Sequence, residues 1–408
     1  MISERTKKAL FILGFIALVM GIASALYLLF FRQPSPTKEA FTDEELLALL
    51  ESGTLPTALE GTQTTQTESG EEENLPQADA VAQGGVTQTT TLTLSPVQAA
   101  ELHGNNMNYY DENDGRFYTI DENGEVRRLS ETSFPKAESV AWNNTTDKIV
   151  VEFPDGSNIV YDFQTGKQVT LPKHWEDFSF SSSGSNEIIA KSIGDDPGNR
   201  ALIVSNADGS NVRAVQALGE NAEKVTISPA PHDQVIAFSD TANQNNSFGR
   251  GLIIPVGKNQ ENFKGLIIEG FGFDSLWSPR GDYIVYSTVN TETNLPELWS
   301  VSGSTSNLGE NRRRLSLNTW IDKCTFSVQT ELYCAVPTNL PAHAGLQRDL
   351  AFGIEDVIYK IDIQSGHSSL VGSTDVNASM TRLRISSDGR ILYFINESSG
   401  LLQSIQLK

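Results

Sequence analysis

A pattern of short strands that repeats about every 35–50 residues is the feature that most restricts how this chain can fold. One copy, from Ser139 to Pro172, contains four short runs rich in β-branched and aromatic residues. The pairs Asp155-Gly156 and Thr165-Gly166 separate the later runs, and such pairs favour the tight turns of β-hairpins. Each copy is therefore predicted to form a small antiparallel sheet of four strands.

Copies of this unit follow one another through most of the chain. The sequence holds seven, with six or eight as alternative counts; the first is recognised only in its outer part, Met107 to Ser130, and the last, Thr381 to Lys408, has three strands. The alternating segment Gly85 to Leu94 has no other partner and is predicted to supply the missing strand. A ring of such sheets buries both faces of each blade against its neighbours. The predicted fold is an all-β, seven-bladed β-propeller over residues 86–408.

Similar turn phrases stand between the predicted first and second strands of several copies. They are Trp277 to Gly281 (WSPRG), Ile227 to Pro229 (ISP) and Ile385 to Gly389 (ISSDG). These phrases resemble the S-P-D-G turns of the WD40-like repeat found in TolB-type and dipeptidyl-peptidase-type propellers, and the resemblance covers most of residues 137–408. The segments Asn143 to Asp147 and Phe326 to Gln329 depart from it. The resemblance implies the propeller fold but no particular activity, because such propellers host binding, scaffolding and catalysis.

An apolar segment precedes the repeats: residues 9–31 are 23 residues without a charge. A helix of this length can cross a hydrocarbon core about 30 Å thick. The alternative is a cleavable signal peptide, whose apolar region is typically about 7–15 residues, and the longer run here favours an uncleaved transmembrane helix. Arg5, Lys7 and Lys8 precede it and only Arg32 and Lys38 follow nearby, which favours a cytoplasmic tail at 1–8. The sequence thus predicts a single-pass cell-membrane protein whose propeller is extracytoplasmic.

Residues 32–85 are predicted to be a linker. Within it, Thr42 to Gly53 has an N-cap residue, a capping-box Glu45 and a terminal glycine, which predicts a short helix at 42–52. From about residue 60 onward the linker is acidic and rich in Thr, Gln and Glu, with no Lys or Arg. Such a composition offers little to bury and predicts a disordered tether.

Charge and cysteine content narrow the function classes. The formal net charge is −21, which repels the phosphate backbone of nucleic acids, so nucleic acid is not an expected partner. The two cysteines, Cys324 and Cys334, are too few for a disulfide framework. They lie at equal distances from a predicted turn at Gln329 and so face each other across a hairpin. They form either a disulfide or a pair of buried free thiols.

The sequence contains no recognisable catalytic or metal-binding motif. A prolyl-peptidase-like enzyme would need a G-x-S-x-G nucleophile elbow, which the sequence lacks. The five histidines fall in different copies without metal-ligand spacing. The acidic stretch Asp111 to Gly115 has its glycine one position early for a calcium loop, so an ordinary turn is favoured. No catalytic residue, metal or cofactor is predicted.

Two features are candidates for binding a partner. The basic cluster Arg312, Arg313 and Arg314 stands in an acidic domain and could receive an acidic peptide segment or a carboxylated glycan; a solvated strand edge is the alternative. The segment Val336 to Asp356 in the sixth copy is longer than a hairpin needs. It carries the other candidate residues, which are Leu346, Arg348, Leu350 and Phe352. Its alternative role is to cover the core at the edge of the blade.

The sequence favours a non-enzymatic scaffold over an enzyme: a membrane-tethered propeller of the cell envelope that binds a protein, a peptide or an envelope polymer. The alternative is a glycan- or peptide-processing enzyme with its site in the funnel of the propeller. A third alternative is a sensor or assembly subunit that couples through its membrane helix, since the predicted cytoplasmic tail is too short for a signalling domain. The sequence does not place side chains in the funnel, so it does not decide among these functions.

Overall fold

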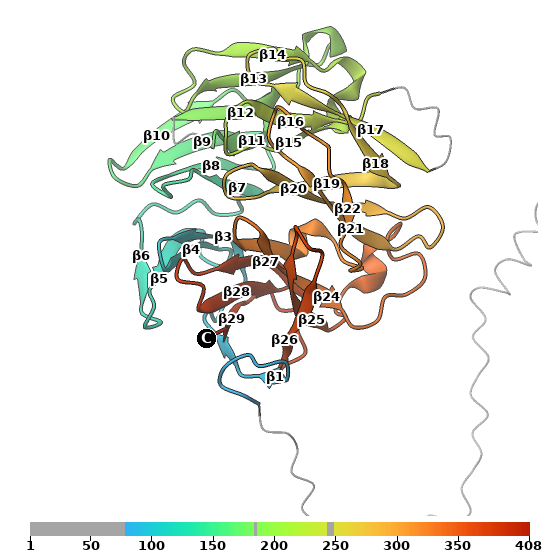
Figure 1. Ribbon diagram of the computed structural model, residues 1–408. Helices are drawn as coiled ribbons and strands as arrows, with labels where there is room; N and C mark the ends of the chain where they lie inside the picture. Colours follow the sequence, from blue (N-terminus) through green and yellow to red (C-terminus); the bar gives the residue numbers. More distant parts are fainter. Residues whose placement is uncertain (1–77, 183–185, 243–248) are drawn as a thin grey trace, which may run out of the picture. The chain divides into compact units, whose positions relative to one another are not determined.

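The computed structural model describes residues 78–182, 186–242 and 249–408 (Figure 1). The predicted cytoplasmic tail, the predicted transmembrane helix at 9–31 and the predicted short helix at 42–52 lie outside these residues. Within the described ranges, no helix is both long enough and apolar enough to span a membrane.

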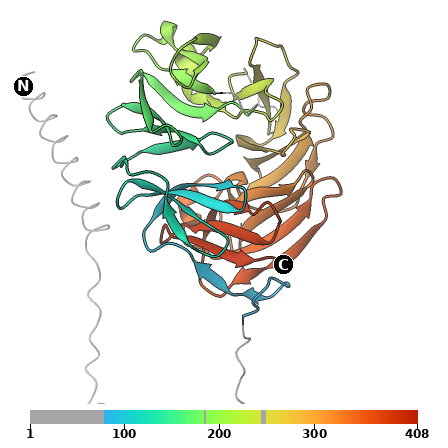
Figure 2. The ribbon, with the colours of Figure 1, turned by 90° about the vertical axis from the view of Figure 1, so that its left-hand side faces the viewer.

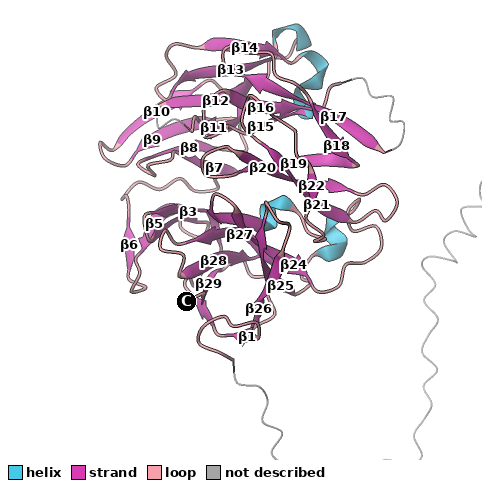
Figure 3. Ribbon diagram, viewed as in Figure 1, coloured by secondary structure: helices cyan, strands magenta, loops and turns pink. Residues whose placement is uncertain are grey.

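The described residues form seven sheets arranged as the blades of a β-propeller, which confirms the predicted fold (Figures 1 and 3). In the first five blades the chain adds the four strands in sequence order. The strands are β3 (Val97–His103), β4 (Asn106–Asp111), β5 (Arg116–Ile120) and β6 (Val126–Arg128); β7 (Ser139–Trp142), β8 (Lys148–Glu152), β9 (Asn158–Asp162) and β10 (Lys167–Leu171); β11 (Trp175–Phe180), β12 (Glu187–Ser192), β13 (Ala201–Asn206) and β14 (Arg213–Ala217); β15 (Val225–Ile227), β16 (Val235–Ser239), β17 (Arg250–Gly257) and β18 (Leu266–Glu269); β19 (Phe271–Trp277), β20 (Tyr283–Val289), β21 (Pro296–Ser302) and β22 (Arg313–Arg314). Three short 3₁₀ helices lie between strands, η1 (Pro197–Asn199), η2 (Gly219–Lys224) and η3 (Ile321–Lys323).

The last two blades combine both ends of the domain. Their own strands are β23 (Cys324–Val328), β24 (Glu331–Pro337), β25 (Asp356–Asp362) and β26 (Ser368–Thr374), with η4 (Arg348–Ala351) in between, then β27 (Met380–Ile385), β28 (Ile391–Asn396) and β29 (Leu402–Gln406). Strand β2 (Thr89–Thr91) pairs with β29 as the fourth strand of blade seven, as the alternation of Gly85 to Leu94 predicts. Strand β1 (Val86–Thr87) adds a fifth, parallel strand to blade six, which the sequence did not indicate. Figure 2 shows this blue N-terminal segment against the red C-terminal blades.

Ordered contacts begin before the predicted start of the propeller. The backbone N–H of Ala82 donates to Gln406 O, and that of Gly84 donates to Val371 O, both at 2.9 Å. Asp79 forms an isolated bridge with Thr87. Residues 79–85, which composition assigned to the linker, therefore continue the pairing of β1 and β2 and hold the ring closed by long-range hydrogen bonds.

The hydrophobic core is divided into seven clusters, one between each pair of neighbouring blades. Strand β8 shows why: Ile149 and Val151 face blade one, Val150 faces blade three, and all three are 0% exposed. A strand buried on both faces needs a continuous apolar run, as in the second and third strands of most copies. Burial between blades, at roughly 25 cal/mol per Å², is the main force that holds the ring together.

The recurring turn phrase has a specific hydrogen-bonding role. In blade five, Ser278 Oγ accepts the N–H of Tyr283 at 3.0 Å, and in blade seven Ser386 Oγ accepts that of Ile391 at 3.0 Å. In blade two, where the phrase is absent, Asn143 Oδ1 accepts the N–H of Lys148 at 2.9 Å. A side-chain oxygen bonding five residues ahead is thus common to the three turns. Serine and asparagine can both supply it.

Candidate functional site

The basic cluster lies on and beside the outer strand of blade five, and its members are engaged within the protein. Arg312 pairs with Glu269 at 2.7 Å and stacks over the Trp299 ring. Arg314 pairs with Glu297 at 2.5 Å. Arg313 donates to Ser365 O at 3.2 Å and forms no salt bridge with a described residue, although its charge acts on the nearby Asp362. Of the three, Arg313 therefore keeps the most hydrogen-bonding capacity for a ligand.

The long segment of blade six connects β24 to β25 and is fixed to the ring. Arg348 forms a two-bond ion pair with Asp322 of η3, at 2.9 and 2.5 Å, and stacks over Trp320 at 5.1 Å. Gly345 N donates to Asn294 O of blade five at 2.9 Å. The other candidate residues of the segment are solvent-exposed: Leu346 is 50%, Leu350 44% and Phe352 62% accessible. Arg348 thus serves to position the segment, and the three apolar side chains face solvent.

The remaining candidates are structural. Cys324 and Cys334 are opposite each other on β23 and β24 and form a disulfide, with their Cα atoms 4.1 Å apart. The stretch Asp111 to Gly115 is a turn in which Asp111 Oδ1 accepts the N–H of Asn113. No group of three or more His, Cys, Asp or Glu residues suited to a metal ion occurs among the described residues.

The arrangement of the ring places a different set of residues at its centre. Strands of a blade alternate in direction, so the connections between second and third strands lie at the same end of the ring as those that enter the first strands. The long blade-six segment and the helices η1, η2 and η3 all belong to these connections. We call this end of the ring the loop face. The first strands form the wall of the central channel: β3 contacts β7 and β27, β11 contacts β7 and β15, and β23 contacts β27.

Four of the first strands carry the same irregularity near the loop face. In β3, β11, β19 and β27 one extra residue interrupts the pairing with the second strand. A residue in the left-handed region lies in each bulge, with φ of 52° at Ala99, 56° at Asp177, 71° at Gly272 and 50° at Arg382. Bulges re-aim the side chains beside them and are frequent next to functional sites. Glu101, Asp274 and Arg384 follow three of these bulges at equivalent positions.

Charged side chains from these strands line a pocket of about 260 Å³ in the channel wall of blades five to seven, which we call the channel mouth. Asp274, Asp322, Arg382 and Arg384 are among its lining residues. A second hollow of about 530 Å³ shares Ser275, Leu276 and Arg384 with it and continues toward the opposite end of the ring. The two hollows together trace the central channel. Sequence reasoning missed this site because its residues come from blades whose register the bulges shift.

The two arginines at the channel mouth differ in their ion pairing. Arg384 forms a two-bond ion pair with Glu101 across the junction of blades seven and one, at 3.0 and 2.8 Å, which raises the pKa of the Arg384 guanidinium. Arg382 has no ion pair with any residue that the structure describes. Although the Arg382 side chain is solvent-exposed, the surrounding channel wall, and then the nearby Arg384, lower its pKa. Asp322 and Glu101 act on Arg382 from a distance, but neither forms an ion pair with it, so its guanidinium remains available to an anionic ligand.

Asp274 is a carboxylate of the channel mouth whose charged form is disfavoured. Asp274 is solvent-exposed, yet the surrounding channel wall raises the pKa of its carboxyl and Asp322 raises it further, despite a hydrogen bond of 2.8 Å from the N–H of Ser275. A raised folded-state pKa means that folding favours the protonated form. The contribution of Asp274 to stability is therefore present below its unfolded pKa of about 3.9 and is lost as the pH rises through the folded pKa.

We expect Asp274→Asn to raise the thermal midpoint at pH 8, because the amide removes a carboxylate that the channel disfavours. The difference from the unchanged protein should disappear near pH 3, where both proteins are neutral at this position. Thermal denaturation followed by circular dichroism across this pH range measures the effect. A variant that is destabilised at pH 8 by the same amount as at pH 3 would contradict the assignment.

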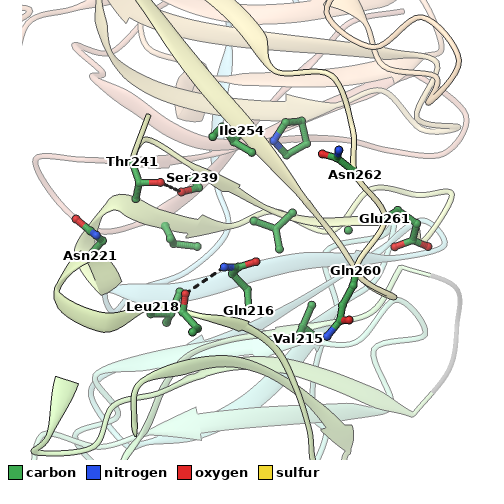
Figure 4. Close-up of a pocket in the computed structure, with 15 residues that line it drawn as sticks. Val215, Gln216, Leu218, Asn221, Ser239, Thr241, Ile254, Gln260, Glu261 and Asn262 are labelled. Carbon is green, nitrogen blue, oxygen red and sulfur yellow. Dashed lines mark hydrogen bonds between the residues drawn. The ribbon is translucent and has the colours of Figure 1, made fainter. Parts of the chain in front are cut away.

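A further pocket of about 640 Å³ lies at the outer rim between blades three and four (Figure 4). Only the first half of β17, Arg250 to Ile253, pairs with β18, and beyond it Val256 forms an isolated antiparallel bridge with Asn262. Gln216 of β14 and Ile254 of β17 line the gap from opposite sides, and Glu261 is its single charged lining residue. Pro255 has no backbone N–H to donate, which disfavours the addition of another strand along this part of β17.

Comparisons with known proteins identify the architecture. No protein-family model matches the chain, and no curated protein matches its sequence. Solved structures that match over 78% of this chain include the β-propeller domain of Cps50 (Swd1) from Myceliophteria thermophila, at 11% identity, TM-score 0.52 and 100% of that chain. An oligogalacturonate lyase in complex with manganese matches at 12% identity, TM-score 0.54 and 93% of its chain. The tricorn protease matches at 10% identity and TM-score 0.50, over only 34% of its own chain. At these identities the likeness shows the β-propeller fold alone.

Proposed function

We propose that this protein is a non-enzymatic binding scaffold whose channel mouth receives a carboxylate from an acidic segment of a protein partner. The observation that carries the proposal is Arg382, which lacks an ion pair within the described residues and extends from a backbone position with φ of 50°. Non-glycine residues in this region cost about 1–3 kcal/mol and persist mainly where they serve a function. The side chain of Arg382 is solvent-exposed, so its guanidinium is accessible to a ligand and can form a charge-assisted pair with a carboxylate.

Neighbouring residues define the shape of this receptor. Arg348 and Arg384 are already paired, with Asp322 and Glu101, so they hold the walls in place without competing for the ligand. The exposed Leu346, Leu350 and Phe352 lie on the same loop face and can contact apolar residues that flank the acidic segment. A partner with a short acidic stretch next to apolar side chains fits these features best.

The test is binding of a fluorescent octapeptide of glutamate to the full-length protein, measured by anisotropy. Arg382→Gln should weaken binding about tenfold, because one charge-assisted pair is lost. Arg128→Gln, which removes an exposed arginine of blade one, should leave the affinity unchanged and serves as the control. Absence of peptide binding, or equal affinities for the unchanged protein and the Arg382 variant, would refute the proposal.

A second candidate function is an enzyme that processes a glycan or peptide in the channel. Its supporting observation is Asp274, whose raised pKa favours a protonated carboxyl that could act as a general acid. In that case Asp274→Asn would abolish turnover and leave binding of the glutamate octapeptide intact. In the scaffold, no turnover of glycans or peptides occurs in either protein.

We further propose that residues 9–31 anchor the propeller outside the cytoplasm of a cell membrane. The support is the length of the uncharged segment and the positive residues before it. Protease added to intact cells should cut within the linker and release a folded propeller. If release requires lysis of the cells, the orientation is wrong.

A further inference from the structure

A pocket of about 600 Å³ lies between blades five and six, at the end of the ring opposite the loop face; we call it the rim pocket. Its walls come from β20 to β22 of blade five, the connection that joins β21 to β22, and two turns of blade six. It shares no lining residue with the channel mouth. It is therefore a separate site, independent of the proposed function of the channel.

Cross-blade hydrogen bonds hold the walls of the rim pocket in place. Gln364 Nε2 donates to Tyr283 Oη at 2.6 Å. The side chain of Gln329 accepts the N–H of Arg280 at 2.9 Å and donates to Asp282 Oδ2 at 3.0 Å. These contacts join turns of blade six to blade five. Preformed walls reduce the entropic cost of binding, since few side chains need to be ordered by the ligand.

The rim pocket is lined by polar side chains, which include both hydrogen-bond donors and hydrogen-bond acceptors. Serine hydroxyls at 302 and 304 and the amide of Asn311 both donate and accept. Within this set, Asn311 Nδ2 donates to Ser302 Oγ at 3.0 Å, which holds both side chains in place. Closely spaced donors and acceptors of this kind match the hydroxyl groups of a sugar.

Two arginines in the rim pocket favour a ligand that carries negative charge. Arg280 and Arg313 line the pocket from β20's turn and from β22, and the only carboxylate in the lining, Asp282, is already paired with Arg280 at 3.2 Å. Arg313 retains donors beyond its single bond to Ser365 O. Beside the lining lies the Asp362 carboxyl, whose pKa is lowered first by the N–H of Ser365 and also by Arg313, so it partly offsets the charge of Arg313. Arginine binds carboxylates through paired N–H groups.

We propose that the rim pocket binds an oligosaccharide that carries carboxylate groups. The serine and asparagine side chains contact its hydroxyls, and Arg280 and Arg313 contact its carboxylates. The basic cluster singled out by the sequence thus contributes through Arg313, while Arg312 and Arg314 maintain the blade through their ion pairs.

The experiment is calorimetric titration of the full-length protein with a hexasaccharide of alternating glucuronate and N-acetylglucosamine. The double variant Arg280→Gln/Arg313→Gln should weaken binding about tenfold or more. Arg390→Gln is the matched control: Arg390 pairs with Asp388 two residues away in the corresponding turn of blade seven, as Arg280 pairs with Asp282, and it is similarly exposed, at 70% against 74%. The Arg390→Gln variant should bind the hexasaccharide with the same affinity as the unchanged protein. Thermal melts establish that all variants are folded.

Further arms distinguish this site from the channel mouth and from simple charge attraction. The neutral hexasaccharide of N-acetylglucosamine should bind at least about tenfold more weakly than the acidic one. Arg382→Gln should leave binding of the acidic hexasaccharide unchanged, even if the channel proposal fails. The proposal is overturned by an absence of binding at millimolar ligand, by equal affinity for the neutral sugar, or by a double variant that binds as tightly as the unchanged protein.

Discussion

Replacement of Lys323 by methionine is expected to lower the free energy of unfolding by about 3–5 kcal/mol, because it leaves a buried carboxylate without its counter-charge. Lys323 is 2% and Asp356 0% exposed, and their Nζ and Oδ2 atoms are 2.8 Å apart. Burial raises the pKa of the Asp356 carboxyl even with Lys323 beside it. Without the ammonium group this carboxyl should take up a proton, so the loss should shrink as the pH falls.

A second variant distinguishes the effect of the unpaired carboxylate from the effect of the changed side-chain shape. In Lys323→Met/Asp356→Asn the amide oxygen can still accept the N–H of Met380, which now donates to Asp356 Oδ2 at 2.6 Å. This double variant should recover most of the stability that the single variant loses. Lys360→Met, which removes an ion pair with a lysine 40% exposed, should cost less than about 1 kcal/mol. Urea denaturation at pH 7 and pH 5 measures all three; a double variant as unstable as the single one would contradict the explanation.

Gly270→Ala should be destabilising by at least about 3 kcal/mol, because two penalties combine at this position. Gly270 has φ of 85°, and an added Cβ would lie 2.1 Å from the carbonyl oxygen of Val289. The residue connects β18 directly to β19, so relief of the clash requires movement of the strand that carries the Gly272 bulge and Asp274. The mutation should therefore disturb the channel mouth as well as the core.

Gly104→Ala provides the matched control for this prediction. Gly104 has φ of 64°, but an added Cβ would meet no atom within 4 Å. Only the backbone penalty applies there, so the loss should be about 1 kcal/mol. Urea midpoints of the two variants give the comparison directly. Equal losses would show that the contact with Val289 relaxes without cost.

Local patterns in the sequence were sufficient to predict the blades. In blade two all four predicted strands are present, because alternating and continuous apolar runs separated by Asp-Gly and Thr-Gly turns depend on contacts near in sequence. The closing strand at Thr89–Thr91 was also predictable, because blade seven lacked one strand and only Gly85 to Leu94 had no partner. The facing positions of Cys324 and Cys334 followed from their distances to the turn.

The channel mouth could not be predicted in the same way. Its ion pair between Glu101 and Arg384 joins residues 283 positions apart, and a short pattern cannot specify such a contact. The bulges at Ala99, Gly272 and Arg382 decide which side chains follow them into the channel, yet these three residues share no sequence signal. The cluster Arg312 to Arg314 shows the converse: its charges are evident in the sequence, and only the fold reveals that Glu269 and Glu297 neutralise two of them.

The sequence by itself determined the repeat, the four-stranded unit and the closure of the ring, since apolar periodicity and turn chemistry act over a few residues and are read directly from their order. Only the tertiary structure decided which charges meet at the channel mouth and at the rim pocket. Those sites form where different blades come together, and one extra residue in a first strand changes which side chain faces the channel. Arg382 and Arg313 therefore gain their roles from the ring as a whole.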